Sequence, residues 1–204
     1  MGNDLATTKR IAVLLADGFE EAEAVVFIDI MRRLKINVDV LACKNERHVN
    51  SYFKVNITAD FTLSEKFDDD YDAVMMPGGP EGTANLTSDE MVIGFLKRHI
   101  ARGKLICPLC SSGAKVVAAN GLFGQHKYVS GADFYKSFDD GVHVDQKVVV
   151  DGQFISGKGL GVVFDFSFIV AEHLIGKGDV EDKSSVRWQA QHIDYDGWPY
   201  AEQS

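Results

Sequence analysis

Short apolar runs alternate with longer amphipathic stretches along most of this chain, and that alternation limits the available folds more than any other feature. The apolar runs have the length and composition of buried strands, and the longer stretches have helical spacing. The expected strands are residues 10–16, 37–42, 71–76 and 105–108. The expected helices are residues 20–34, 89–99, 111–120 and 162–174. This order predicts an α/β fold in which a mostly parallel sheet carries helices on both faces.

The end of the chain departs from this simple alternation. Short β segments near Val142, Val148 and Phe154 predict a small antiparallel addition to the sheet. After Gly178 the sequence becomes polar, yet it holds both tryptophans, which a purely disordered tail would lack. We therefore expect residues 1–178 to form one domain and residues 179–204 to form a tail that packs on it or on a partner.

Composition excludes several classes of protein. The formal net charge of −9 and the absence of a Lys/Arg run argue against a nucleic-acid binder. No apolar run approaches the roughly 20 residues that span a bilayer, and the N-terminus lacks the apolar core of a signal peptide. Three cysteines are too few and odd in number for a disulfide framework. We expect a cytoplasmic protein that does not bind membranes.

The stretch LICPLCSSG, residues 105–113, places Cys107 and Cys110 three residues apart and permits several chemistries. A redox pair would sit at a helix start, but no proline-bearing loop follows in the domain as in thioredoxin-like folds. A zinc site needs four ligands, and the six histidines show no paired metal spacing. A third interpretation is a nucleophile on a sharp strand-to-helix turn. Two buried structural cysteines remain the plain alternative.

The nucleophile interpretation uses more of this stretch. Small residues must flank a nucleophile on such a turn, and Ser111, Ser112 and Gly113 follow Cys110 at once. Amide groups at a helix start lower the pKa of a thiol and so favour its thiolate. In this interpretation Cys110 is the reactive thiol and Cys107 is a packed strand residue.

Two further stretches follow expected strands and lead to the same edge of the sheet. PGGPEG, residues 77–82, supplies Gly78 and Gly79, whose amides can form an anion-binding concavity, or simply an ordinary glycine turn. DGFEEAEA, residues 17–24, places Glu23 among small and apolar residues at a helix start. A buried carboxyl there would have a raised pKa and donate a hydrogen bond to a thiolate.

A third glycine-rich turn and three remaining residues give no evidence of a further site. GKGLG, residues 157–161, lacks the G-x-G-x-x-G spacing of a dinucleotide site, so we expect a backbone turn that shapes the crevice. We interpret His143 and His173 as surface or packed residues and Cys43 as buried.

These motifs, in this order and at these separations, resemble the ThiJ/PfpI superfamily, in the branch of the parkinsonism-associated protein deglycase (the DJ-one family). The resemblance rests on LADGFEEAEAVVFIDIMRRLKI, DAVMMPGGPEGTANL, KLICPLCSSGAKVVAANGLFG and DGQFISGKGLGVVFDFSFIVAEHLIGK, and it covers about residues 9 to 178. It implies a flavodoxin-like three-layer sandwich and usually a homodimer.

The resemblance also implies roles for single residues. Cys110 matches the oxidation-sensitive nucleophile of the family, and Glu23 matches the protonated glutamate beside it. Gly78, Gly79 and Ser111 match the backbone around the thiolate, where the Gly79 and Ser111 amides would hold an oxyanion. Arg33 matches an arginine near the dimer interface and the site.

The chain departs from the family pattern at several positions. The protease-like members carry a histidine directly after the cysteine, where this chain has Ser111, so a Cys-His dyad at that spacing is absent. Some members place a histidine after the elbow helix, in a slot that falls near Ser130 here, and His126 could replace it only through a different loop. Leu160 stands where the family turn has a proline, and the aromatic tail is longer.

The leading hypothesis is a cysteine-dependent glyoxalase or deglycase. Cys110 would attack an α-oxoaldehyde such as methylglyoxal, or a glycated protein or nucleotide amine, while Glu23 moves protons. No cofactor and no metal is expected. One rival is an oxidative-stress sensor or redox-regulated chaperone in which Cys110 becomes a sulfinic acid. A third hypothesis is an amidase or peptidase.

Overall fold

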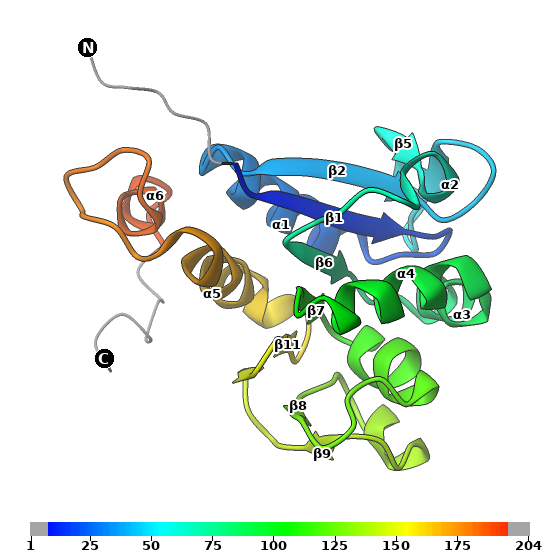
Figure 1. Cartoon of the computed structure of the whole chain (residues 1–204). Coiled ribbons are helices and arrows are strands. Elements are labelled where there is room, and N and C mark those ends of the chain that lie inside the picture. The colour runs from blue at the N-terminus through cyan, green and yellow to red at the C-terminus, as the bar shows by residue number, and fades with distance from the viewer. Residues whose placement is uncertain (1–7, 196–204) are drawn as a thin grey trace.

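The computed structural model describes residues 8–195 and shows one central sheet of seven strands (Figure 1). The sheet order is β10-β11-β7-β6-β1-β2-β5. Its strands are β1 (Arg10–Leu15), β2 (Asn37–Ala42), β5 (Phe61–Thr62), β6 (Ala73–Met76), β7 (Leu105–Pro108), β10 (Val148–Asp151) and β11 (Phe154–Gly157). All neighbours pair in parallel except β10, which is antiparallel to β11. The α/β prediction and the antiparallel addition are confirmed.

The alternation of side chains along β1 creates two hydrophobic clusters, one on each face of the sheet. Ile11, Val13 and Leu15 face α1 (Glu21–Arg33) and α5 (Val163–Ile175). Ala12 and Leu14 belong to the opposite cluster, which includes side chains of α4 (Glu90–Ala101). Each large apolar side chain buried in this way stabilises the fold by about 1.5–3 kcal/mol, so both layers hold the sheet in place.

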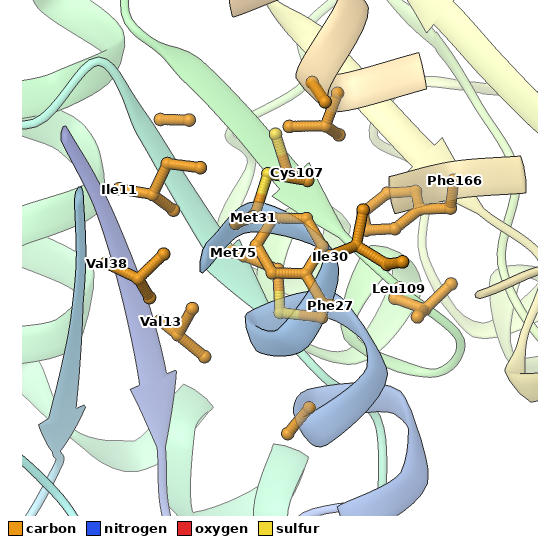
Figure 2. Packing of buried hydrophobic residues seen from close by; sticks show 14 of the residues in the cluster. Ile11, Val13, Phe27, Ile30, Met31, Val38, Met75, Cys107, Leu109 and Phe166 are labelled. Carbon is orange, nitrogen blue, oxygen red and sulfur yellow. The ribbon is translucent and has the colours of Figure 1, made fainter. Parts of the chain in front are cut away.

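Cys107 belongs to the cluster under α1 and α5. Figure 2 shows Cys107 in the same cluster of buried side chains as Met31 and Met75, and the residue is fully buried. This burial raises the pKa of the Cys107 thiol well above its ordinary range. Cys107 therefore packs the core, where its buried thiol is poorly placed for thiol–disulfide exchange.

Several smaller elements lie outside the main alternation, and most were missed by sequence reasoning. The missed ones are the hairpin of β3 (His48–Asn50) with β4 (Asn56–Thr58), α2 (Leu63–Lys66), α3 (Pro80–Ser88) and β8 (Lys127–Tyr128). The short strand expected near Val142 is present as β9 (Val142–His143), but it pairs in parallel with β8 and not with the antiparallel addition. The sequence of α3, PEGTANLTS, contains glycine, threonine, asparagine and serine, which form helices poorly in isolation. Tertiary packing sustains it, because a Cβ on Gly82 would lie 2.8 Å from the Phe19 backbone.

The helix expected over residues 111–120 has an unusual form. It begins as a π-helical turn at Gly113–Val117, continues as a 3₁₀ turn at Ala118–Asn120, and ends at Gly121 with a left-handed φ of 66°. Ser112 fastens the turn before it, since its hydroxyl donates to the carbonyls of Leu109 (2.7 Å) and Met76 (2.9 Å).

The C-terminal segment adds a short helix, α6 (Val186–His192), beside α5. Val186 and Ala190 are buried in the cluster under α1 and α5, and Tyr195 stacks on Phe164 and Phe168. Trp188 lies on α6, whereas Trp198 lies outside the described residues. Between residues 8 and 195, no helix has the length and apolar character needed to cross a bilayer.

Candidate active site

Four of the parallel strands end at one place, and the loops that follow them converge there. The loop after β1 leads to Glu23 in the first turn of α1, and β6 leads to Gly78 and Gly79. β7 leads to Cys110, and β11 leads to Gly159. Open α/β sheets bind ligands outside the carboxyl ends of their strands, at the point where the strand order reverses.

Cys110 occupies a strained backbone conformation at the tip of β7. Its φ of 60° lies in the left-handed region, which costs a non-glycine residue about 1–2 kcal/mol. Three hydrogen bonds hold it there. Its amide donates to the Gly157 carbonyl (2.9 Å), and its carbonyl accepts from the Gly131 amide (3.1 Å) and the Ser130 hydroxyl (3.0 Å). The geometry is that of a nucleophile elbow, with the thiol turned toward solvent-accessible space.

Gly78 and Gly79 let the backbone approach the thiol closely. A Cβ on Gly78 would lie 2.8 Å from Cys110 Cβ and 3.1 Å from Glu23 Oε2. Gly79 has a φ of 106°, and a Cβ there would lie 2.2 Å from the Gly18 carbonyl oxygen. A side chain on Gly78 would separate the sulfur from the Glu23 carboxyl, and a side chain on Gly79 would clash with the loop that leads to α1.

Glu23 is a buried carboxyl beside this thiol. Its side chain is 1% exposed, and Oε2 accepts a 2.7 Å hydrogen bond from the Gly78 amide. Oε1 is buried and has no partner with hydrogen-bond geometry in the described part of the chain. Burial raises the pKa of Glu23 to about 7, although the Gly78 amide and the Cys110 thiol act in the opposite direction. Near neutral pH the carboxyl can therefore both accept and donate a proton.

The thiol and the carboxyl titrate as a pair. Burial and the nearby Glu23 carboxylate raise the pKa of Cys110 to about 12, while the Ser111 amide favours the thiolate. The sequence predicted a lowered pKa, and the structure differs because it encloses the sulfur next to an acid. When Glu23 holds the proton, its repulsion disappears and its O–H can donate to sulfur. The thiolate therefore forms together with the protonated Glu23.

A pocket of about 270 Å³ opens above the pair. Its base is formed by Glu23, Gly79, Cys110 and Ser111, which the sequence had assigned to one site. The structure thus brings these four residues together, and Gly78 joins them through its hydrogen bond to Glu23. No group of three or more metal-ligating side chains occurs between residues 8 and 195.

Two residues named from the sequence lie elsewhere. Arg33, in the last turn of α1, is exposed, pairs with Asp29 at 2.6 Å, and does not line the pocket. His126 packs on Phe154 and lies 3.6 Å from Asp151, again outside the pocket.

The segment around Ser130 does reach Cys110, but without an imidazole. The Ser130 hydroxyl donates to the Cys110 carbonyl, and a Cβ on Gly131 would lie 3.1 Å from Cys110 Sγ, so glycine stands beside the sulfur. No histidine lines the pocket among residues 8–195, which leaves Glu23 as the acid or base in contact with the thiol.

Sequence reasoning missed the upper wall of the pocket. Tyr52 and Phe53, from the turn between β3 and β4, line it together with Glu20, Phe134 and Leu160. The hairpin reaches the site because Ser51 bridges to Phe19 and the Tyr52 amide donates to the Phe19 carbonyl (2.8 Å). No local pattern signals this long-range pairing. Leu160 could have been assigned to the pocket from the sequence, because GKGLG follows a strand that ends at the site.

Comparisons with known proteins agree with this architecture. The model of the DJ-1/PfpI family matches residues 9–173. The crystal structure of a cysteine-to-alanine variant of a DJ-1 superfamily protein from Salmonella typhimurium superposes with a TM-score of 0.88. It shares 51% sequence identity and covers 92% of this chain and 99% of that one.

Two curated relatives show how far the likeness extends. Protein DJ-1 homolog B of Arabidopsis thaliana is 34% identical over 83% of this chain, which spans only 39% of that protein. The glutathione-independent glyoxalase DJR-1.2 of Caenorhabditis elegans is 27% identical, over 84% of this chain and 92% of its own length. The strand-end crevice, the cysteine elbow and the family match over residues 9–173 lead to one conclusion. The chain belongs to the DJ-1/PfpI family.

Proposed function

We propose that this protein is a cofactor-independent glyoxalase that converts α-oxoaldehydes such as methylglyoxal into hydroxy acids. One observation carries the proposal: the Cys110 thiol and the buried Glu23 carboxyl, whose pKa lies at about 7, meet at the base of a pocket. The C. elegans relative named as a glutathione-independent glyoxalase supports the same chemistry.

The first step forms a bond between sulfur and the aldehyde carbon. The Cys110 proton passes to the Glu23 carboxylate as the thiolate attacks. The carbonyl π electrons move to oxygen, and the amides of Gly79 and Ser111, which line the pocket, stabilise the resulting oxyanion. The protonated Glu23 then gives its proton to this oxyanion, which yields a neutral hemithioacetal on Cys110 and restores the Glu23 carboxylate.

The second step moves a proton between adjacent carbons. Glu23, again as carboxylate, removes the proton from the former aldehyde carbon, and an enediolate forms with its negative charge on the neighbouring oxygen. The hydroxyl proton on the former aldehyde carbon passes to that oxygen, and the protonated Glu23 returns its proton to the neighbouring carbon. These transfers leave a thioester of the hydroxy acid on Cys110 and a Glu23 carboxylate. Water hydrolyses this thioester, releases the hydroxy acid and restores the thiol. One methylglyoxal and one water thus give one lactate, with no change in net oxidation state.

The same attack by Cys110 extends the proposal to a deglycase activity. Early glycation adducts on protein or nucleotide amines carry the carbons of an α-oxoaldehyde, so their removal would use the same pair of residues.

We also propose that the protein acts as a homodimer in the cytoplasm. The exposed apolar side chains of Val25 on α1 and Phe164 on α5 support the dimer, since a second copy would cover them.

A second candidate function is an oxidation sensor, and the orphaned Glu23 Oε1 favours it. Two equivalents of peroxide would convert the Cys110 thiol into a sulfinic acid and release two waters. A protonated Glu23 would then donate to a sulfinate oxygen and satisfy Oε1, which now lacks a partner.

The two candidates differ in what the reduced protein does to methylglyoxal. The test incubates reduced protein with methylglyoxal, without glutathione and with EDTA, and quantifies both aldehyde and lactate. We expect one lactate for each methylglyoxal over many turnovers, and loss of the activity after peroxide treatment. Aldehyde loss that stops near one equivalent per thiol, without lactate, would contradict the glyoxalase and leave the sensor.

A further inference from the structure

The upper wall of the pocket is apolar and remains open to solvent. Phe53 is 69% exposed, Tyr52 43%, Leu160 45% and Phe134 36%. These residues, which we call the rim, come from three separate loops yet line the same pocket above Cys110. Tyr52 and Phe53 meet edge to face with ring centroids 4.8 Å apart. An apolar wall that encloses a reactive thiol suits a ligand with an apolar substituent.

The pocket is also larger than the smallest α-oxoaldehydes require. Its volume of about 270 Å³ holds about nine non-hydrogen atoms at ~30 Å³ each, the volume that water takes in the liquid. Methylglyoxal has fewer atoms than this, whereas phenylglyoxal fills the space. With the aldehyde carbon at Cys110 Sγ, the substituent has to point away from the glycine floor and toward the rim.

The charges at the pocket are of one sign. Glu20 and Glu23 line it, and no Lys, Arg or His among residues 8–195 does so. Lys115 is the cation next to the rim, where its ammonium lies 4.0 Å from the Phe134 ring centroid, outside the pocket lining. A substrate with its own carboxylate or phosphate would therefore approach two acids without a compensating cation.

We propose that the rim and Glu20 set the specificity of this site, so that it takes neutral α-oxoaldehydes with an aromatic or bulky apolar substituent and rejects anionic ones. The inference rests on the proposed function and adds the substrate class to it. The rim residues make apolar contacts with the substituent, and the Glu20 carboxylate repels a substituent that carries a negative charge.

The test compares kcat/KM for phenylglyoxal, methylglyoxal and the anionic 4-carboxyphenylglyoxal in the wild type and three variants. In the wild type we expect phenylglyoxal to exceed both methylglyoxal and 4-carboxyphenylglyoxal, each by about tenfold or more. Phe134→Ala should lower the phenylglyoxal-to-methylglyoxal ratio about five- to tenfold. Glu20→Gln should raise the 4-carboxyphenylglyoxal-to-phenylglyoxal ratio by a similar factor. Met91→Ala, which removes an exposed apolar side chain on α4, is the matched control and should change neither ratio.

Two readouts separate this inference from the proposed function. Equal kcat/KM for all three aldehydes, with activity that still needs Cys110, would overturn the specificity and leave the glyoxalase intact. If no aldehyde is turned over, the selectivity of binding is measured alone, as the protection of Cys110 from alkylation by iodoacetamide, read from the mass of the Cys110 peptide. Better protection by phenylglyoxal than by 4-carboxyphenylglyoxal supports the inference, and equal protection overturns it. Light scattering gives the mass of each variant in solution. A rim variant that loses its selectivity only because it no longer associates with a second copy would also overturn the inference.

Discussion

Glu23→Gln is expected to lower the rate of lactate formation by about 10²–10⁴-fold, the range that general acid–base catalysis contributes. Glutamine can accept the hydrogen bond of the Gly78 amide and can donate to the Cys110 sulfur, so the site keeps its shape. It cannot take the thiol proton or carry a proton between the two substrate carbons. The rate of the wild type should rise with pH through about 7, where Glu23 ionises, and this dependence should vanish in the variant.

The same substitution should stabilise the folded protein at alkaline pH. Burial holds the pKa of Glu23 at about 7, above the ordinary value of 4.5. The stabilising contribution of the protonated carboxyl is complete below pH 4.5 and is lost as the pH rises through 7. The shift corresponds to about 3 kcal/mol at about 1.4 kcal/mol for each pKa unit. Glutamine never ionises, so the variant avoids this loss.

Urea unfolding at pH 4.5 and pH 8 measures the effect. The free energy of unfolding of Glu23→Gln should exceed that of the wild type at pH 8 by about 1–3 kcal/mol and approach it at pH 4.5. Glu90→Gln, an exposed acid in the first turn of α4, serves as the control and should show no such gain. Wild-type turnover in Glu23→Gln would refute the acid–base role of Glu23. A difference in unfolding free energy that is the same at both pH values would refute the raised pKa of Glu23.

Gly79→Ala is expected to cost about 3–5 kcal/mol of folding free energy. The φ of 106° is one that a residue with a Cβ rarely adopts, which costs about 1–3 kcal/mol. The new methyl group would also lie 2.2 Å from the Gly18 carbonyl and 2.9 Å from the Glu20 amide, and these are backbone atoms that cannot rotate away. Relief of that overlap must push α3 from the start of α1 and so pull apart the two loops that carry Glu23 and the Gly79 amide.

Gly103→Ala separates conformational strain from this overlap. Gly103 also has a positive φ, 67°, but a Cβ there meets nothing within 4 Å. The control should lose only about 1–2 kcal/mol and keep full activity. Urea unfolding and lactate assays on both variants check the comparison. Equal losses in the two variants would show that the close approach at Gly79 contributes nothing.

The sequence was most informative where neighbouring residues determine the structure. The apolar runs of β1, β6 and β7 predicted their strands because burial on both faces requires continuous apolar sequence. Cys110 could be assigned because the residue that follows a parallel strand reaches the ligand edge of the sheet. Glu23 lies in the first helical turn after such a strand, at the same edge.

The remaining features depend on long-range packing. Tyr52 and Phe53 reach the pocket only because the β3–β4 hairpin bridges to Phe19, which no local pattern encodes. The helix α3 has weak intrinsic propensity and is sustained by its contact with the loop after β1. The raised pKa of Cys110 likewise follows from burial next to a carboxyl that is distant in sequence.

The central claim is that the Cys110 thiol carries out the chemistry, and a side-by-side lactate assay on Cys110→Ser and Cys43→Ser tests it most directly. Cys43 directly follows β2 and is free and half-buried, where the sequence predicted a buried residue; it does not line the pocket, so its variant should keep wild-type turnover. Cys110→Ser should fold normally and lose turnover by about 10³-fold or more, because a hydroxyl beside Glu23 is a far weaker nucleophile. Lactate formation by Cys110→Ser at the wild-type rate would contradict the account.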